Sequence, residues 1–416
     1  MLETMNDEEM RRGNIGIVPI ILPHAKEYHQ ALRELDWAEP FFLGLNSVVK
    51  LQIREAIASI GNALDLFKVG YSDAACFCLR QAIELATCFA YIHELPENER
   101  KEKLSAWKAH AHWFPTRGKM KKRLESLDGE YADMQSRMPR FFLHVEEVNE
   151  RLNKHVHKQG YEYCYSYRRF LPTEKKRAIH ENLVRQYEGF VKETIGVVAV
   201  CKLVIDPLPV LLSDEEVANR LPDMLTEPYS PGFMEKYLGE EFVREFKTTR
   251  RYEECWKDIM KKPRLNDAVY NIKQWYHFDR GNVDQVLDQI EQLNYHERLV
   301  VLLAMFSNKI ARVYFHDGLL MYFTDVKSNN VDFSLSSEDF KKIRLGESRR
   351  NNPFKGSLLS VFSSYDNHAF FVEHDVPFED NEWNELCAMV DKYNQSVVQI
   401  VQQLQLQKTN ETQTGK

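Results

Sequence analysis

An arginine and a histidine near the middle of the chain have the residue types and the spacing needed to cleave a phosphodiester. Arg151 and His157 are separated by five residues, and Asn153 lies between them. Cleavage of RNA through the ribose 2′-hydroxyl needs a group that takes or gives a proton, and histidine titrates near neutral pH. It also needs a fixed cation beside the phosphate, which arginine supplies. Arg151, His157 and Asn153 are therefore the candidate catalytic residues, in a reaction that requires no metal ion.

The helix that carries this motif decides whether the arginine and the histidine can meet. At ~100° per residue, Arg151 and His155 lie ~40° apart on a regular helix, whereas Arg151 and His157 lie ~120° apart. His157 joins Arg151 only if the helix ends there, which Gly160 favours, or if a second copy of the chain contributes one of the two side chains. The alternative is that His157 packs or forms a hydrogen bond at a helix end without a catalytic role.

The motif and an earlier helix resemble the HEPN (higher eukaryote and prokaryote nucleotide-binding) superfamily. The resemblance rests on a Leu-Arg-x-x-x-Glu segment, residues 79–84, and an Asn-x-x-Val-His segment, residues 153–157, and it covers residues 41–205. It implies a metal-independent endoribonuclease whose site is completed across a homodimer. It also implies a setting in bacterial stress response or antiphage defence, where such bundles act as toxins. In the commonest form of the motif the arginine would fall at Leu152. Members that lack the catalytic arginine imply a second reading, a non-catalytic module that binds RNA, a nucleotide or a protein.

A basic segment interleaved with aromatic residues is the second candidate site. Residues 100–123 contain nine Lys and Arg residues against one acid, Glu102. Basic side chains neutralise phosphates and exposed aromatic rings stack on bases, so this composition is typical of a site for single-stranded RNA. The alternative is a solvated loop whose tryptophans enter the core. Two histidines, His110 and His112, occur here without an evident third ligand, so no metal site is predicted. The candidate RNA-binding residues are Lys108, Arg117, Lys119, Lys121, Lys122, Arg123 and Trp113.

Arg80 and Glu84 are four residues apart in a helix that is otherwise apolar. Residues at this spacing share a helix face, and charged groups in an apolar setting are normally paired. We therefore expect a structural ion pair between them.

The composition excludes several classes of function. The formal net charge is −7, so the whole chain is not a general polyanion binder. Seven scattered cysteines without a Cys-x-x-Cys pair indicate reduced thiols and a cytoplasmic location. We expect no membrane contact, because the sequence shows nothing near the ~20 apolar residues of a spanning helix. We also expect no cofactor, since the sequence lacks a glycine-rich phosphate loop and a nucleophile elbow.

The hydrophobic periodicity predicts a mainly α protein of two domains. Residues 1–40 are expected to form an N-terminal arm, with an extended stretch over residues 14–22. Residues 41–205 are expected to form an antiparallel helical bundle, and residues 206–232 a linker that contains a capping box of Ser213 and Glu216. The predicted bundle helices cover residues 41–67, 72–92, 119–134, 139–157 and 172–205.

The second half is expected to be an α+β domain, residues 233–408, followed by a disordered tail, residues 409–416. Two β-prone runs flank Asp317-Gly318, which predicts a hairpin. Further short strands are expected at residues 331–335 and 369–372. The predicted helices cover residues 233–261, 266–276, 283–293, 295–308 and 383–407.

Three functions are consistent with these features. The first is the metal-independent ribonuclease, with the second domain sensing a trigger or holding a protein regulator. The second is the non-catalytic binding module, and the third is a structural helical adaptor. Charge changes in the basic segment should abolish RNA affinity under the first two and have no effect under the third.

Overall fold

The computed structural model describes residues 17–40, 47–165, 167, 170–222, 226–331, 335–346 and 348–414. The chain forms two compact units, residues 1–262 and 263–416. Unit 1 is helical, and unit 2 combines helices with a six-stranded sheet, so the predicted mainly α architecture with a small C-terminal sheet is confirmed.

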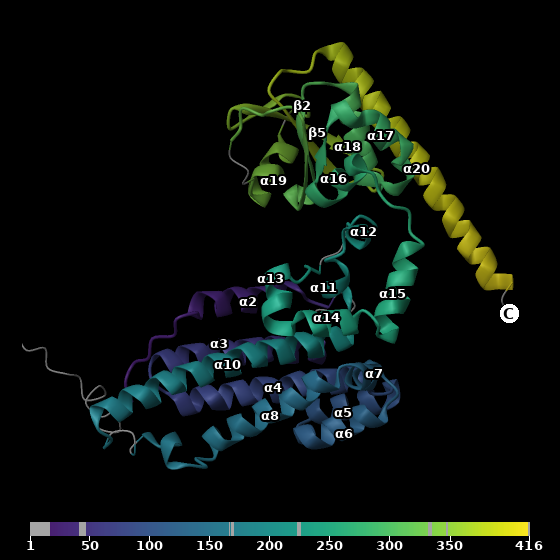
Figure 1. Ribbon diagram of the computed structural model, residues 1–416. Helices are drawn as coiled ribbons and strands as arrows, with labels where there is room; N and C mark the ends of the chain where they lie inside the picture. Colours follow the sequence, from purple (N-terminus) through teal and green to yellow (C-terminus); the bar gives the residue numbers. More distant parts are fainter. Residues whose placement is uncertain are drawn as a thin grey trace, which may run out of the picture. The chain divides into compact units, whose positions relative to one another are not determined.

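Unit 1 is built around four long helices that run side by side (Figure 1): α3 (Val48–Lys68), α4 (Ser72–Glu94), α8 (Pro139–Val156) and α10 (Thr173–Ile205). Helix α4 packs against α3, α8, α10 and the shorter α6 (Arg117–Ser126). Its fully buried side chains include Leu79, Ile83 and Phe89. Among the described residues, α4 is the one helix long and apolar enough to cross a membrane, and 67% of its apolar window is buried inside unit 1. A core helix with partners on several sides has this composition.

The turn between α3 and α4 requires a glycine. Gly70 has φ +95°, a left-handed conformation that side chains disfavour. A Cβ atom at this position would also collide with the backbone carbonyl of Val18. The N-terminal segment therefore lies directly against this turn, and Ile20 N donates a 2.8 Å hydrogen bond to the carbonyl of Lys68.

Three predictions for unit 1 need correction. The expected N-terminal arm contains a helix, α2 (Ala25–Trp37), because Tyr28, Ala31, Leu32 and Leu35 form an apolar stripe that is buried in the core. The expected helix over residues 119–134 divides into α6 and α7 (Glu130–Arg137). At the start of α7 the Glu94 carboxylate accepts a 2.9 Å hydrogen bond from the amide of Tyr131. This carboxylate lies so close to Gly129 that a Cβ atom at that position would collide with it. The basic segment is partly helical as well, as α5 (Glu97–Lys108).

The boundary between the units lies later than the linker expected at residues 206–232. Aromatic side chains beyond that linker, including Phe233, Tyr237, Phe242 and Phe246, belong to the same core cluster as the bundle helices. The expected helix over residues 233–261 is interrupted at Gly239 (φ +88°) and at Thr249, whose hydroxyl accepts the amide of Tyr252. Asp214, rather than Ser213, caps the short helix that follows it. The elements of this region are α11 (Leu208–Leu211), α12 (Glu215–Ala218), α13 (Pro231–Phe233), the π-helical turn η2 (Met234–Leu238), α14 (Glu240–Phe246) and α15 (Arg250–Met260).

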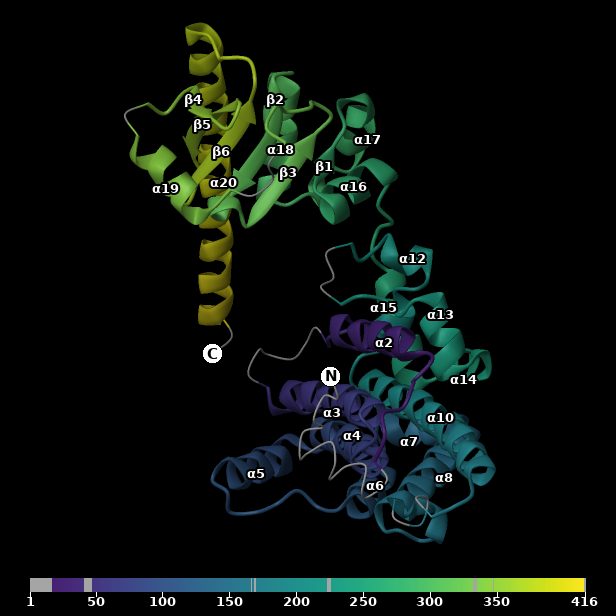
Figure 2. The same cartoon turned by 90° about the vertical axis from the view of Figure 1, so that its left-hand side faces the viewer.

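Unit 2 contains a mixed sheet with the strand order β1-β3-β2-β6-β5-β4 (Figure 2). Strand β1 pairs with β3 in parallel, and the other pairs are antiparallel. The expected hairpin and the strand expected at residues 369–372 are confirmed as β2–β3 and β6, whereas the strand expected at residues 331–335 falls largely outside the described residues. The strands are β1 (His277–Phe278), β2 (Ile310–Phe315), β3 (Leu320–Thr324), β4 (Asn352–Phe354), β5 (Ser357–Ser363) and β6 (Ala369–His374).

Alternating side chains place two separate apolar clusters on the two faces of this sheet. Val313 and Phe370 pack with the helical layer, and Tyr314 and Phe371 pack on Phe340 of α19 (Ser337–Leu345). Helix α20 (Asp380–Thr414) continues through residues 409–414 of the tail that was expected to be disordered. The helical layer consists of α16 (Asp267–Trp275), α17 (Val283–Asp288), α18 (Tyr295–Phe306) and α20 (Asp380–Thr414), with the 3-10 turns η3 (Arg280–Asn282) and η4 (Ile290–Gln292).

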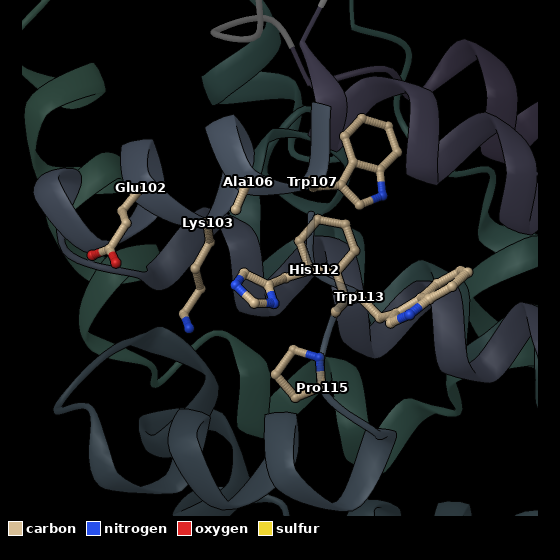
Figure 3. A pocket seen from close by; sticks show the side chains of 8 residues that line it. Glu102, Lys103, Ala106, Trp107, His112, Trp113 and Pro115 are labelled. Atoms are coloured by element: carbon tan, nitrogen blue, oxygen red, sulfur yellow. The ribbon is translucent and has the colours of Figure 1, made fainter. Parts of the chain in front are cut away.

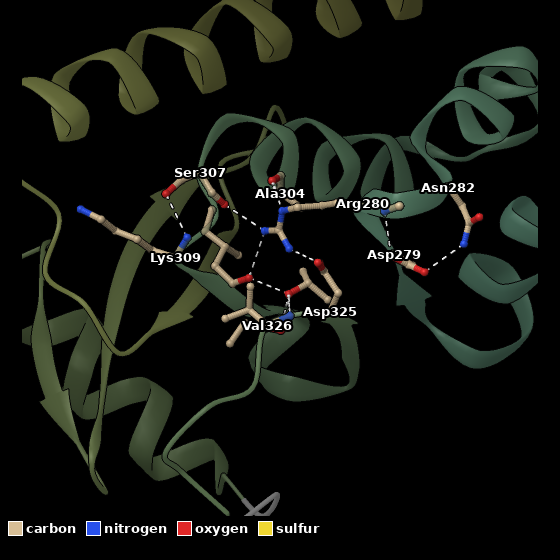
Figure 4. Close-up of polar contacts among 12 residues, drawn as sticks. Asp279, Arg280, Asn282, Ala304, Ser307, Lys309, Asp325 and Val326 are labelled. Atoms are coloured by element: carbon tan, nitrogen blue, oxygen red, sulfur yellow. Dashed lines mark hydrogen bonds and ion pairs between the residues drawn. The ribbon is translucent and has the colours of Figure 1, made fainter.

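Arg280 joins the helical layer to the sheet (Figure 4). Its guanidinium donates to the carbonyls of Ala304 at 2.7 Å and Ser307 at 2.9 Å, at the end of α18, and it pairs with Asp325 beyond β3. Helix ends leave carbonyls without intrahelical donors, so one arginine satisfies several of them here. The arrangement is a structural clamp within unit 2.

Candidate nucleic-acid interface

The connection between α5 and α6 forms an aromatic pocket of about 410 Å³ (Figure 3). The rings of Trp107 and Phe114 stack in it with their centroids 5.7 Å apart and an angle of 28° between their planes. Lys103 and His112 lie beside these rings and Pro115 completes the wall. The pocket therefore presents flat apolar faces together with polar side chains.

Trp113 is almost fully exposed at this pocket. Its side chain is 97% exposed, in contrast to the half-buried Trp107 six residues earlier. Exposing an indole to water forgoes the hydrophobic free energy that its burial would contribute. The alternative, in which the tryptophans of this segment enter the core, holds in part for Trp107 and is wrong for Trp113.

The predicted RNA-binding cations fall into two groups. Lys108, Lys119 and Lys122 are exposed, and none of them forms an ion pair with another described residue. Arg117, Lys121 and Arg123 are held by acids of the same unit. Arg123 pairs with Glu99 of α5 at 2.8 Å, and Lys121 pairs with Glu146 of α8 at 2.9 Å.

Arg117 and Glu146 form the strongest of these pairs. Both oxygens of the Glu146 carboxylate accept hydrogen bonds from the Arg117 guanidinium, at 2.8 and 2.9 Å. Partial burial raises the pKa of Glu146, but its hydrogen bonds to Arg117 and Lys121 outweigh this effect and lower the pKa to about 2. The pair ties α6 to α8. Arg117 and Lys121 are thus both engaged by carboxylates of the same unit, Arg117 by Glu146 and Lys121 by Glu146 and Glu125.

The arginine of the α8 motif packs on an aromatic ring of α10 that His155 also contacts, and not on His157. Helix α8 ends at Val156, as expected from Gly160, and His157 is exposed in the turn that follows. Arg151 is also exposed, and its guanidinium carbon lies 5.2 Å from the centre of the Phe190 ring of α10. His155 packs against the same ring, 5.4 Å between centroids, but is only 5% exposed. Among the described residues, no hydrogen bond joins Arg151 to His157.

Asn153 is half-buried between these positions, and its side-chain oxygen is buried without a hydrogen-bond partner among the described residues. Within a single chain, the Asn153 side-chain oxygen therefore forms no hydrogen bond that would orient Arg151 or His157. The turn after α8 is instead fastened to the start of α4, where Asp73 N donates a 2.9 Å hydrogen bond to the hydroxyl of Tyr165.

The ion pair expected between Arg80 and Glu84 is not found among the described residues. Both side chains are half-buried, because α4 leaves part of its surface open, with Phe77 49% exposed beside them. Water can solvate charged side chains at such positions, so neither residue requires an oppositely charged partner on the same helix.

Sequence reasoning missed two residues that the structure brings to these sites. Lys103 lines the aromatic pocket, and its spacing of four residues from Trp107 on α5 was the available signal. Phe190 lies about 40 residues beyond Arg151 in the chain, and nothing local to either residue indicates their contact.

In the part of the chain that the structure describes, no group of three or more His, Cys, Asp or Glu side chains is arranged to hold a metal ion. No protein-family model, curated protein or solved structure matches this chain, so the functional interpretation rests on its own residues.

Proposed function

We propose that unit 1 is a binding module for single-stranded RNA and that its contact surface is the α5–α6 pocket with the neighbouring lysines. The observation that carries the proposal is the 97% exposed Trp113 beside the stacked rings of Trp107 and Phe114. Every base has a flat face, so aromatic side chains bind single strands with little sequence preference. A base that stacks on Trp113 covers the apolar surface that water now touches.

One acid, Glu102, lines the pocket, and exposed lysines that flank the pocket residues in the sequence suit the backbone of the same ligand. Lys108, Lys119 and Lys122 are exposed, and no acid among the described residues neutralises them. Each lysine that contacts a phosphate releases a condensed counterion, which makes binding stronger at low salt. The net charge of −7 does not oppose this, because the interaction is local.

Fluorescence anisotropy of a labelled single-stranded RNA tests the proposal. Trp113→Ala should weaken binding roughly 5- to 150-fold, because stacking contributes about 1–3 kcal/mol per base. Trp275→Ala is the matched control, since Trp275 is 64% exposed in unit 2 and should leave the affinity unchanged.

The lysines are tested by the salt dependence of the same affinity. Lys119→Glu and Lys122→Glu should each reduce the slope of log affinity against log salt by about 1. Lys26→Glu is the control, because Lys26 is an exposed lysine of α2. Equal affinity for wild type and all variants would place the RNA contact outside this surface, and no measurable RNA binding would favour the structural adaptor instead.

The second candidate function is a metal-independent endoribonuclease of the HEPN-like kind, acting in bacterial stress response or antiphage defence. Arg151 would stabilise the charge on the phosphate, His157 would act as acid or base, and Asn153 would orient one of them. One observation favours it: Arg151 and His157 are both exposed, and no carboxylate among the described residues neutralises Arg151. A second copy of the chain would have to bring the two side chains together.

Incubation of the protein with RNA in the presence of EDTA tests this candidate. Arg151→Ala and His157→Ala should both abolish cleavage, whereas Lys154→Ala, an exposed residue of the same helix, should not. Cleavage that increases with the square of protein concentration would indicate a site shared between two copies. Cleavage that survives both variants would exclude this site.

A further inference from the structure

Unit 2 contains a cationic pocket of about 280 Å³ beside the turn that joins β5 and β6. The two strands are neighbours in the sheet (Figure 2). The end of α19 contributes Arg344, the following loop contributes Arg349, the last residue of β5 contributes Ser363, and the β5–β6 turn contributes His368. The apolar side chains of Val361, Phe362 and Ala369 also line it. None of its described lining residues is acidic.

Both arginines are held in place while part of each guanidinium stays available. Nη2 of Arg344 contacts both carboxylate oxygens of Asp317 at 3.1 Å, so Asp317 offsets the charge of Arg344, whereas no described carboxylate forms an ion pair with Arg349. Nη2 of Arg349 donates to the hydroxyl of Ser363 at 3.1 Å, and the Arg349 carbonyl accepts the amide of Val361 at 2.7 Å. The Nε and Nη1 groups of both arginines donate to no described residue. Two oriented guanidinium groups match the oxygens of a phosphate, which accepts paired hydrogen bonds.

The two turns beside the pocket hold non-glycine residues in the left-handed region. His316 and Asp317 both have φ 52°, and Asn367, which lines the pocket, has φ 64°. Asn and Asp tolerate this conformation in turns better than most other residues, at a small cost in free energy. The two turns present Asp317 to Arg344, and they bring the ring of His316 to 6.3 Å from that of His368. The β2–β3 turn thus positions the carboxylate that holds Arg344, and the β5–β6 turn supplies Asn367 and His368 to the pocket.

We propose that this pocket binds a small phosphomonoester of the mononucleotide class. The phosphate lies between Arg344 and Arg349, with His368 and Asn367 at its rim. The sugar or base covers Val361 and Ala369. The pocket lies near the lower end of the ~300–1,000 Å³ range of ligand sites, which suits one phosphate with one ring system. This site is independent of the RNA surface proposed for unit 1.

Isothermal titration of the full-length protein with adenosine 5′-monophosphate tests the proposal, with adenosine and inorganic phosphate as comparison probes. We expect one adenosine 5′-monophosphate bound per chain and at least tenfold weaker binding of adenosine. Arg349→Gln and Arg344→Gln should each weaken adenosine 5′-monophosphate binding about tenfold or more, because each removes hydrogen bonds between charged groups. Lys341→Gln, an exposed residue of α19 outside the pocket, should have no effect.

The variants distinguish a lost site from a lost fold. Arg349 is exposed, so Arg349→Gln should keep the circular dichroism spectrum and the RNA affinity of the wild type. Absence of binding by both adenosine 5′-monophosphate and phosphate would overturn the proposal. Binding that neither arginine variant weakens would overturn it as well, because the ligand would then lie elsewhere.

Discussion

Lys202 should make the stability of unit 1 depend on pH in a way that Lys202→Met removes. The side chain is 1% exposed on α10, and its nitrogen donates to the carbonyl of Leu35 in α2. Burial lowers its pKa from 10.5 to about 7, although the charges of Asp36, Glu39 and Asp206 act in the opposite direction. The folded protein thus disfavours the ammonium form, which the unfolded chain retains up to about pH 10.

The sign and the size of the effect follow from these two pKa values. Between pH 7 and 10.5 the unfolded chain binds a proton that the folded protein does not, so the free energy of unfolding rises with pH. The linkage relation gives a gain of about 1.6 kcal/mol between pH 7 and pH 8.5. From about pH 8 the buried thiols of Cys88 and Cys201 act in the opposite sense, because burial raises the pKa of each to about 12. Comparison with Lys202→Met, which keeps both thiols, therefore isolates the contribution of the lysine.

Urea denaturation at pH 7.0, 7.5, 8.0 and 8.5, followed by circular dichroism, measures this gain in wild type and in Lys202→Met. Hydrogen exchange of peptides from α2 and α10 assigns the transition to unit 1. The wild type should gain about 1.6 kcal/mol more than the variant across the series. Parallel pH profiles would refute the reasoning, because they would mean that the surrounding acids keep Lys202 charged in the fold.

Three further changes test other parts of the structure. Gly70→Ala should lower the free energy of unfolding in urea by at least about 1 kcal/mol, because its φ is positive and a Cβ meets the Val18 carbonyl, whereas Gly61→Ala within α3 should be neutral or stabilising. Arg280→Ala should destabilise unit 2 by about 3 kcal/mol in urea, since the carbonyls at the end of α18 lose a charged donor; a change under about 1 kcal/mol would show that water replaces it. Glu146→Gln should raise the affinity for single-stranded RNA and steepen its salt dependence, because it releases Arg117 and Lys121; unchanged binding would place these cations outside the RNA contact.

Elements with a strong local signal were predictable. The hairpin of β2 and β3 follows from two β-prone runs around Asp317-Gly318, and the end of α8 follows from Gly160. Helix α4 follows from the apolar residues that are buried along its whole length, and α10 follows from its Pro172-Thr173 start and from its apolar C-terminal half, since its buried residues begin only at Leu183. The break between α6 and α7 was not predictable, because it depends on Glu94, a residue more than 30 positions earlier in the chain.

The candidate sites divide in the same way. The sequence alone identified residues 100–123 as a basic aromatic segment and Arg151 with His157 as a motif, because residue type and spacing are local properties. Only the tertiary structure decided that Trp113 is exposed and that Arg117 is neutralised by Glu146. It also decided that Arg151 contacts Phe190 rather than His157. Such outcomes depend on which helix faces meet, and helix packing is determined by contacts between residues far apart in the chain.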